Sequence, residues 1–154
     1  MKANLFVALA ASGLLLAGTA SAQEKKIKRS DLPPAVEKTV AAQSAGATIK
    51  GFSTEKENGQ TLYEAEMTVN GHSKDISMTE DGSIVEIEEQ VAFDSLSPEV
   101  RAGLQTKAGK GKILKVESLT KKGKLVAYEA KVDTGGKKSE VQVGPDGKPL
   151  DHEE

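Results

Sequence analysis

Apolar and polar side chains alternate along residues 63–69. Tyr63, Ala65 and Met67 stand at alternate positions, and Glu or Thr fills the positions between them. Because successive side chains of a strand point to opposite faces, this period of two predicts a strand that is buried on one face only. Residues 126–132 repeat the pattern, with Tyr128 in the place of Tyr63. The alternation therefore predicts two half-buried strands.

Glycine-containing turns separate these strands from their neighbours. Asn70-Gly71 predicts a tight hairpin turn, because the primed turns that join antiparallel strands need positive φ at their central positions. Gly135-Gly136 follows the second alternating strand in the same way, and Asp81-Gly82 and Asp146-Gly147 close each set. The expected strands lie near residues 48–53, 63–69, 74–78 and 83–89, and near 112–119, 126–132 and 141–143.

A short helix is expected before each set of strands. Ser97 and Pro98 predict a helix start, because a serine hydroxyl caps a free backbone N–H and proline lacks a donor where none is needed. Val100 and Leu104 then share one face, as Val36 and Val40 do after Pro34 in the first half. We expect these helices to end near Gly46 and Gly109, and to need a sheet to pack against.

The two halves repeat at a spacing of about 64 residues. Leu32 to Val36 aligns with Leu96 to Val100, and Tyr63 aligns with Tyr128 after a slip of one residue. Repeats of this length indicate a duplicated structural unit. We expect copies at residues 27–90 and 91–151. The predicted fold class is α+β, with two tandem copies of a helix followed by a three- to four-stranded antiparallel sheet. Because Pro149 interrupts the second copy, residues 148–154 are expected to form a short edge strand at most.

The first 22 residues have the pattern of a secretory signal peptide. A positive start at Lys2 precedes an apolar run over residues 5–17, and Ala20-Ser21-Ala22 provides a cleavage site. The run is too short for a stable transmembrane helix. No other apolar run approaches a spanning length. We therefore expect an exported protein, periplasmic or secreted, with no transmembrane segment in the mature chain.

The mature chain resembles the PepSY-like family of bacterial secreted and membrane-attached modules. The resemblance depends on the Leu-Pro helix start at Leu32, on Tyr-Glu-Ala at Tyr63 with its hairpin glycine, and on the closing Asp-Gly pairs. The tandem arrangement is similar to that of the β-lactamase inhibitory proteins. The resemblance implies helices packed on antiparallel sheet, and it implies a link with inhibition of secreted peptidases and with regulation in the cell envelope. It carries over no functional residue, because the shared motifs are caps, turns and core positions.

Composition excludes several classes of protein. The chain has no cysteine, which excludes disulfides, Cys-ligated zinc, a thiol nucleophile and a lipidated bacterial N-terminus. A formal net charge of -2 lacks the basic excess of a general nucleic-acid binder. Tyr63 and Tyr128 occupy matching apolar positions and are expected in the core, so no stacking surface for bases is predicted.

Few residues are candidates for chemistry. His72 stands beside a hairpin turn and His152 in the C-terminal tail, so neither has an evident nucleophile to activate. Metal ligands could come from Asp151-His152-Glu153-Glu154 or from the acidic run of Glu86, Glu88 and Glu89, although a solvated tail and a solvated strand face explain both better. We predict no enzyme, no catalytic, cofactor-binding or metal-binding residue, and no cofactor.

Charge differs between the halves. Residues 23–92 carry a net charge of -5 and residues 93–154 a net charge of +2, with lysines grouped in the second half at 107–115, 121–124 and 137–138. Two explanations stay open at this stage. The halves dock on each other with complementary potentials, or the basic surface binds an anionic partner.

The functional hypothesis is a non-enzymatic module that binds or inhibits an envelope protein such as a peptidase. Export, the sheets and the family resemblance favour it. The alternative is an accessory binder of metal ions or small ligands, favoured by the histidines and the carboxylate runs. The sequence identifies neither the partner nor the oligomeric state. Because a 60-residue copy is marginal alone, we expect the copies to stabilise each other, either side by side or as one longer sheet.

Overall fold

The computed structural model describes residues 24–57, 59–152 and 154. The signal peptide expected over residues 1–22 lies outside these ranges. The described chain contains eight strands, two α-helices and two 3₁₀ turns. The elements are β1 (Lys25–Ile27), α1 (Pro34–Gln43), β2 (Thr48–Glu57), β3 (Gln60–Val69), β4 (His72–Met78), β5 (Ile84–Val91), α2 (Pro98–Ala108), β6 (Lys112–Lys121), β7 (Lys124–Thr134) and β8 (Lys137–Val143), with the 3₁₀ turns at Arg29–Asp31 and Phe93–Ser95.

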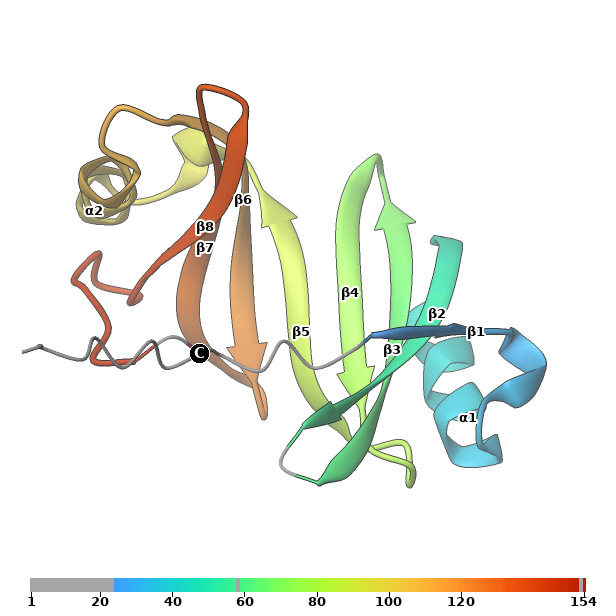
Figure 1. Cartoon of the computed structure of the whole chain (residues 1–154). Helices are drawn as coiled ribbons and strands as arrows, with labels where there is room; N and C mark the ends of the chain where they lie inside the picture. The colour runs from blue at the N-terminus through green and yellow to red at the C-terminus, as the bar shows by residue number, and fades with distance from the viewer. Residues whose placement is uncertain (1–23, 58, 153) are drawn as a thin grey trace, which may run out of the picture.

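All eight strands form one antiparallel sheet in chain order (Figure 1). The predicted fold class, two tandem copies of a helix with its own three- to four-stranded sheet, is therefore wrong. The physical reason is β5, which pairs with β4 on one side and with β6 on the other. Its pairing with β6 runs without interruption from Glu86 opposite Lys121 to Val91 opposite Val116. No sheet edge separates the halves.

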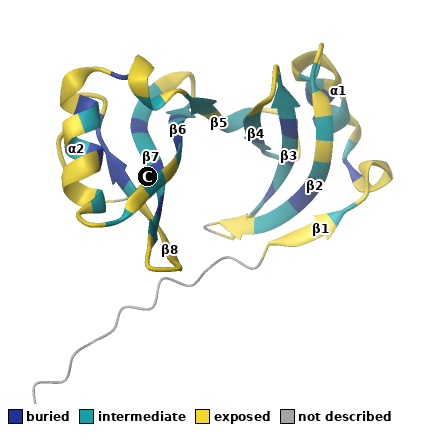
Figure 2. Ribbon diagram, turned by 90° about the horizontal axis from the view of Figure 1, so that it is seen from above, coloured by how far each residue is buried: buried dark blue, intermediate teal, exposed yellow. Residues whose placement is uncertain are grey.

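Both helices pack on the same face of this sheet. Val36 and Val40 of α1 are buried against Ala65, Met67 and other residues of the first half. In the second half, α2 buries Val100 and Leu104 against Val116, Ala130 and Val132. Figure 2 shows the sheet bending near β5, with the two helices on its outer flanks. The core thus consists of two apolar clusters along one curved sheet.

Local features follow the sequence closely. Ser97 caps α2, since its Oγ accepts a hydrogen bond from the backbone N–H of Val100 at 3.2 Å. Asn70 and Gly71 both have positive φ, as the predicted β3–β4 hairpin turn requires. Residues 144–152 contain no strand, so the possible edge strand at Pro149 does not form.

The two Asp-Gly turns have a packing role. Gly82 has a φ of 79° and Gly147 a φ of 77°. A Cβ atom at Gly82 would collide with the backbone oxygen of Ala35 in α1, and one at Gly147 would collide with that of Glu99 in α2. Each turn therefore needs glycine both for its backbone conformation and for the close approach of a helix. These contacts fix the helices against the sheet.

Tyr63 and Tyr128 lie at matching places in the sheet. Tyr63 is opposite Met78 and packs on the first cluster, and Tyr128 is opposite Val143 and packs on the second. Both rings thus contribute to the core, as expected. The repeat boundaries of 27–90 and 91–151 stay a prediction.

No helix within the described ranges is long and apolar enough to cross a membrane.

Candidate functional site

The face of the sheet opposite the helices is the candidate site. Alternation places most apolar side chains of the strands under the helices and most polar ones on the other face, which we call the open face. Three buried apolar side chains also belong to the open face by register, namely Leu62, Leu119 and Ala127. Strand register then assigns the charged and polar members of the open face. They are Lys26, Thr48, Ser53, Glu55, Glu57, Gln60, Glu64, Glu66, Thr68, Ser73, Asp75, Ser77, Glu86, Glu88, Gln90, Lys112, Lys115, Glu117, Lys121, Glu129, Lys131, Asp133, Lys138, Glu140 and Gln142.

Glu117 lies at the centre of the open face and is only 1% exposed. Its carboxylate accepts a hydrogen bond from the Ser73 hydroxyl at 3.0 Å and forms an ion pair with Lys115. The Nζ of Lys131 lies 3.8 Å from the second carboxylate oxygen. A buried charge is costly unless it is paired and hydrogen-bonded, and these three partners satisfy that condition. The centre of the face is therefore a fixed polar network.

Two further carboxyl groups approach Glu117. One oxygen each of Asp75, Glu88 and Glu117 lies within 4.8 Å of the others. Burial, together with the charges of the neighbouring carboxylates Glu86 and Glu117, raises the pKa of Glu88 to about 8. Burial is also the main cause of the raised pKa of Asp75. The cluster consequently holds protons more tightly than isolated carboxyl groups do.

Polar pairs flank this centre on both sides. Ser53 is 1% exposed and donates a hydrogen bond to Glu64 Oε2 at 2.9 Å. Burial raises the pKa of Glu64 to about 7, although the hydrogen bond from Ser53 opposes the shift. On the far side, Gln142 Nε2 donates to Glu129 Oε2 at 2.9 Å. In the part of the chain that the structure describes, no buried polar side-chain atom lacks a partner.

The bend of the sheet brings distant strands together over the open face. A hollow of about 190 Å³ is lined by Glu55 and Glu57 of β2 and by Lys121 and Lys122 at the end of β6. Three strands separate β2 from β6 in the sheet. Their shared hollow shows that the open face is concave at this end.

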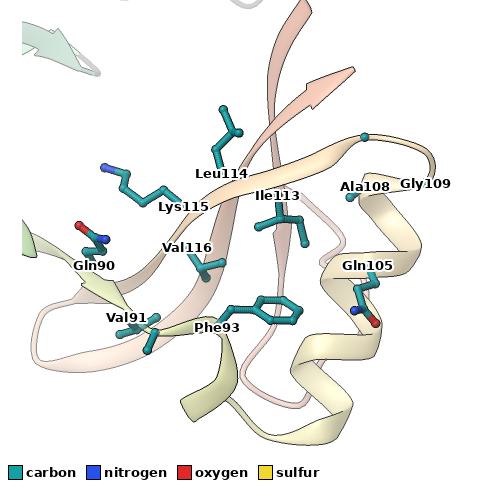
Figure 3. A pocket seen from close by; sticks show the side chains of 12 residues that line it. Gln90, Val91, Phe93, Gln105, Ala108, Gly109, Ile113, Leu114, Lys115 and Val116 are labelled. Carbon is teal, nitrogen blue, oxygen red and sulfur yellow. The ribbon is translucent and has the colours of Figure 1, made fainter. Parts of the chain in front are cut away.

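A larger hollow lies on the helix side of the second half (Figure 3). Its volume is about 490 Å³, within the usual range of small-ligand pockets. Phe93, Ile113 and Val116 form apolar walls, and Gln105 of α2 adds an amide. Leu114 also lines it and is 47% exposed, the one exposed large hydrophobic side chain among the described residues. The pocket could receive a small apolar group.

The residues that the sequence offered as candidates for chemistry lie in different parts of the structure. His72 is exposed at the start of β4, and His152 is exposed in the tail, where its Nε2 lies 3.9 Å from Glu154. The three acids of the run on β5 point to different faces of the sheet, because side chains alternate along a strand. Glu86 and Glu88 lie on the open face, whereas Glu89 lies on the helix side and pairs with Lys74 at 2.8 Å.

Sequence reasoning missed the network around Glu117. Its members Ser73, Asp75, Glu88 and Glu117 come from three strands, and only the pairing of β4, β5 and β6 brings them together. A usable signal was present, because Asp75 and Glu88 alternate with the core residues Ile76 and Ile87 and therefore share the opposite face.

No protein-family model and no curated protein matches the chain. Its fold is nevertheless similar to solved structures of Bacteroides proteins. A candidate periplasmic protein from Bacteroides eggerthii is 16% identical with a TM-score of 0.62, over 77% of this chain and 86% of that chain. A DUF2874 family protein from Bacteroides ovatus is 20% identical with a TM-score of 0.59, over 77% of this chain and 84% of that chain.

A BLIP-like protein from Bacteroides fragilis is also similar. It is 18% identical with a TM-score of 0.54, over 75% of this chain and 81% of that chain. At these identities the likeness shows the fold alone. The expected similarity to β-lactamase inhibitory proteins is thus confirmed at the level of fold. The resemblance to the PepSY-like family stays a prediction.

Proposed function

We propose that the chain is a non-enzymatic binding module that holds a protein partner, such as a peptidase of the cell envelope, on the open face of its sheet. The observation that carries the proposal is the placement of both helices on one face of a single curved sheet. Neither helix lies on the opposite face (Figure 2). Over its second half the end of the tail contacts it, since the backbone N–H of Glu154 donates to Gln142 at 2.9 Å and the Glu154 carboxylate lies 3.6 Å from Lys121. Exposed faces with a fixed polar network and a concave shape suit recognition of another protein.

Rigidity of the open face supports the same function. Ser53, Glu117 and Gln142 are almost fully buried within it, and each has a hydrogen-bond partner. Side chains that are already fixed lose little conformational entropy when a partner binds. The face is therefore preorganised for binding.

Export supports an envelope partner. We propose that the mature protein is periplasmic or secreted, as the pattern of residues 1–22 suggests. The similarity in fold to a candidate periplasmic protein and to a BLIP-like protein is consistent with this location and with inhibition of a partner.

Site-specific crosslinking tests the proposal. The chain has no cysteine, so a single introduced cysteine can carry a photoreactive group at a chosen place. Ser77→Cys places the group on the open face, and Lys38→Cys places it on the exposed side of α1 as a matched control. We expect a saturable crosslink to one envelope protein from Ser77→Cys, which unlabelled chain competes away. A crosslink from Lys38→Cys alone, or none from either position, would refute the proposal.

Divalent-cation binding is the second candidate function. It is favoured by the three carboxyl oxygens of Asp75, Glu88 and Glu117, since carboxylate oxygens are the ligands of hard cations. It ranks second because Lys115 and Lys131 already neutralise Glu117. Calorimetry with calcium and magnesium separates the two functions. An affinity tighter than millimolar that Glu88→Gln abolishes would favour the cation, and weaker binding would retire it.

A further inference from the structure

We infer that the partner carries a loop rich in lysine or arginine, and that this loop docks on the open face over β2–β5. This inference rests on the proposed function, which leaves open what kind of protein surface binds.

The two halves of the open face differ in charge. The register of β1–β5 places seven carboxylates and one lysine on it, whereas the register of β6–β8 places four carboxylates and five lysines on it. The seven carboxylates are Glu55, Glu57, Glu64, Glu66, Asp75, Glu86 and Glu88. The pKa values of about 7 for Glu64 and about 8 for Glu88 reduce the charge at the first end near neutral pH, but that end stays acidic, whereas the other end carries a small excess of lysine.

The acidic end also has few internal counterions. Among the described residues, Glu86 is the one carboxylate of the seven that forms an ion pair, with Lys121 at 3.3 Å. The second half is different, because Glu117 and Glu140 both lie within 4 Å of lysine ammonium groups. The negative potential over β2–β5 is therefore only partly compensated within the chain, by Lys121 at Glu86 and by the charges of Lys115 and Lys131 near Asp75. A basic partner would supply the missing charge.

Proton affinity provides independent support. Burial, with added repulsion from Glu57 and Glu86, raises the pKa of Glu55. The pKa of Glu64 rises for the same main reason, and Asp75 and Glu66 add to it. Repulsion between neighbouring carboxylates is part of each shift, and a fixed positive charge between them would stabilise their ionised forms.

Shape favours a protruding loop over a flat surface. Glu55, Glu64 and Glu66 are only partly exposed, and Glu55 lines the hollow that β2 shares with the end of β6. Lysine and arginine carry their charge at the end of a long apolar stem. A loop bearing such side chains can reach carboxylates at the bottom of a concave face.

The test uses a cyclic peptide with four arginines as the probe and its glutamate counterpart as the control peptide. The variant Glu57→Gln/Glu64→Gln/Glu66→Gln removes three carboxyl groups from the open face, and at about pH 8 Glu64, whose pKa is raised to about 7, is also mostly charged, so the measurements are made there. The matched control Glu80→Gln/Asp94→Asn/Glu99→Gln removes three charges from exposed sites in the β4–β5 loop and near α2. Both variants have the same net charge, so they separate a local surface from overall attraction.

We expect the arginine peptide to bind the full chain, and to bind more weakly as salt rises from about 50 mM to about 300 mM. The open-face variant should lose about tenfold in affinity, as the loss of one exposed and two partly exposed charge pairs predicts, and the control variant should keep the affinity of the wild type. Absence of binding, equal binding of the glutamate peptide, or an equal loss in both variants would overturn the inference.

Two further outcomes separate this inference from the proposed function. If the partner crosslinked from Ser77→Cys binds the open-face variant as tightly as the wild type, the proposed function stands and the basic loop is wrong. If sedimentation at about 50 mM salt shows self-association that the open-face variant abolishes, the occupant is the lysine-rich half of a second copy, which also overturns the inference.

Discussion

Replacing Glu88 by glutamine should stabilise the protein at neutral pH. Glu88 lies on the open face between Asp75 and the buried Glu117, and its pKa is raised from the ordinary value of 4.5 to about 8. Folding therefore favours the protonated form. The stability that this group contributes is fully present below pH 4.5 and is lost as the pH rises towards 8, because the unfolded chain ionises first.

The magnitude follows from the same values. Each unit of pKa difference corresponds to about 1.4 kcal/mol. At pH 7 Glu88 is ionised in the unfolded chain, so the free energy of unfolding is lower by at most about 3 kcal/mol than it would be below pH 4.5. Solvent screening and relaxation of the open face reduce this figure to about 1–2 kcal/mol. A neutral glutamine avoids the cost and keeps the shape of the side chain.

Urea denaturation followed by circular dichroism measures the effect at about pH 5 and about pH 7.5. We expect Glu88→Gln to raise the neutral-pH midpoint by about 1 M and to change the acidic midpoint little. Glu80→Gln, an exposed acid in the β4–β5 loop, is the matched control and should follow the wild type at both pH values. A variant that is no more stable than the wild type at neutral pH would refute the electrostatic description of the open face.

Three further predictions concern packing and pairing, and urea denaturation measures each. Gly147→Ala should lower the free energy of unfolding by about 3 kcal/mol or more, because alanine there is strained and its Cβ meets the α2 backbone. Gly123 has a similar φ and open space around it, so Gly123→Ala should lower the same free energy by about 1 kcal/mol. Equal losses would contradict the close contact. Glu117→Gln should lower the free energy of unfolding by about 2 kcal/mol, because it leaves Lys115 and Lys131 without their buried counterion. An unchanged urea midpoint would be inconsistent with the network around Glu117. A chain ending at Val91 loses the β6 partner of β5 and should be far less stable than the whole, so identical midpoints would exclude mutual support between the halves.

Local structure could be predicted from the sequence because local rules decide it. The helix starts at Pro34 and Pro98, the cap at Ser97 and the hairpin at Asn70 depend on residues a few positions apart. Alternation likewise identified the buried faces of β3 and β7.

The sequence left a single longer sheet as one of two alternatives and did not choose it, because pairing between strands far apart in sequence has no local signal. Residues 83–89 show an ordinary strand pattern, and nothing in them indicates that β6 lies on their free edge. The same limit applies to the candidate site. Asp75, Glu88 and Glu117 are unremarkable acids until three strands align in register.

The charge of the binding surface shows this limit most clearly. The sequence left two explanations for the lysines of the second half, docking against the acidic first half or a basic surface for an anionic partner, and the second remains a prediction. On the open face, however, register gathers a charge of the opposite sign, only partly compensated, over β2–β5. Net charge by segment does not report the charge of a face, because alternation sends neighbouring residues to opposite sides.

The most direct test of the central claim is an NMR titration of the isotope-labelled chain with the protein captured from Ser77→Cys. Side-chain amides of Gln90 and Gln142 report on the open face, and that of Gln105 reports on the helix side. We expect the Gln90 and Gln142 signals to shift in proportion to bound partner while Gln105 stays in place. A shift of Gln105 alone would show that the partner binds the helix side and would contradict the account.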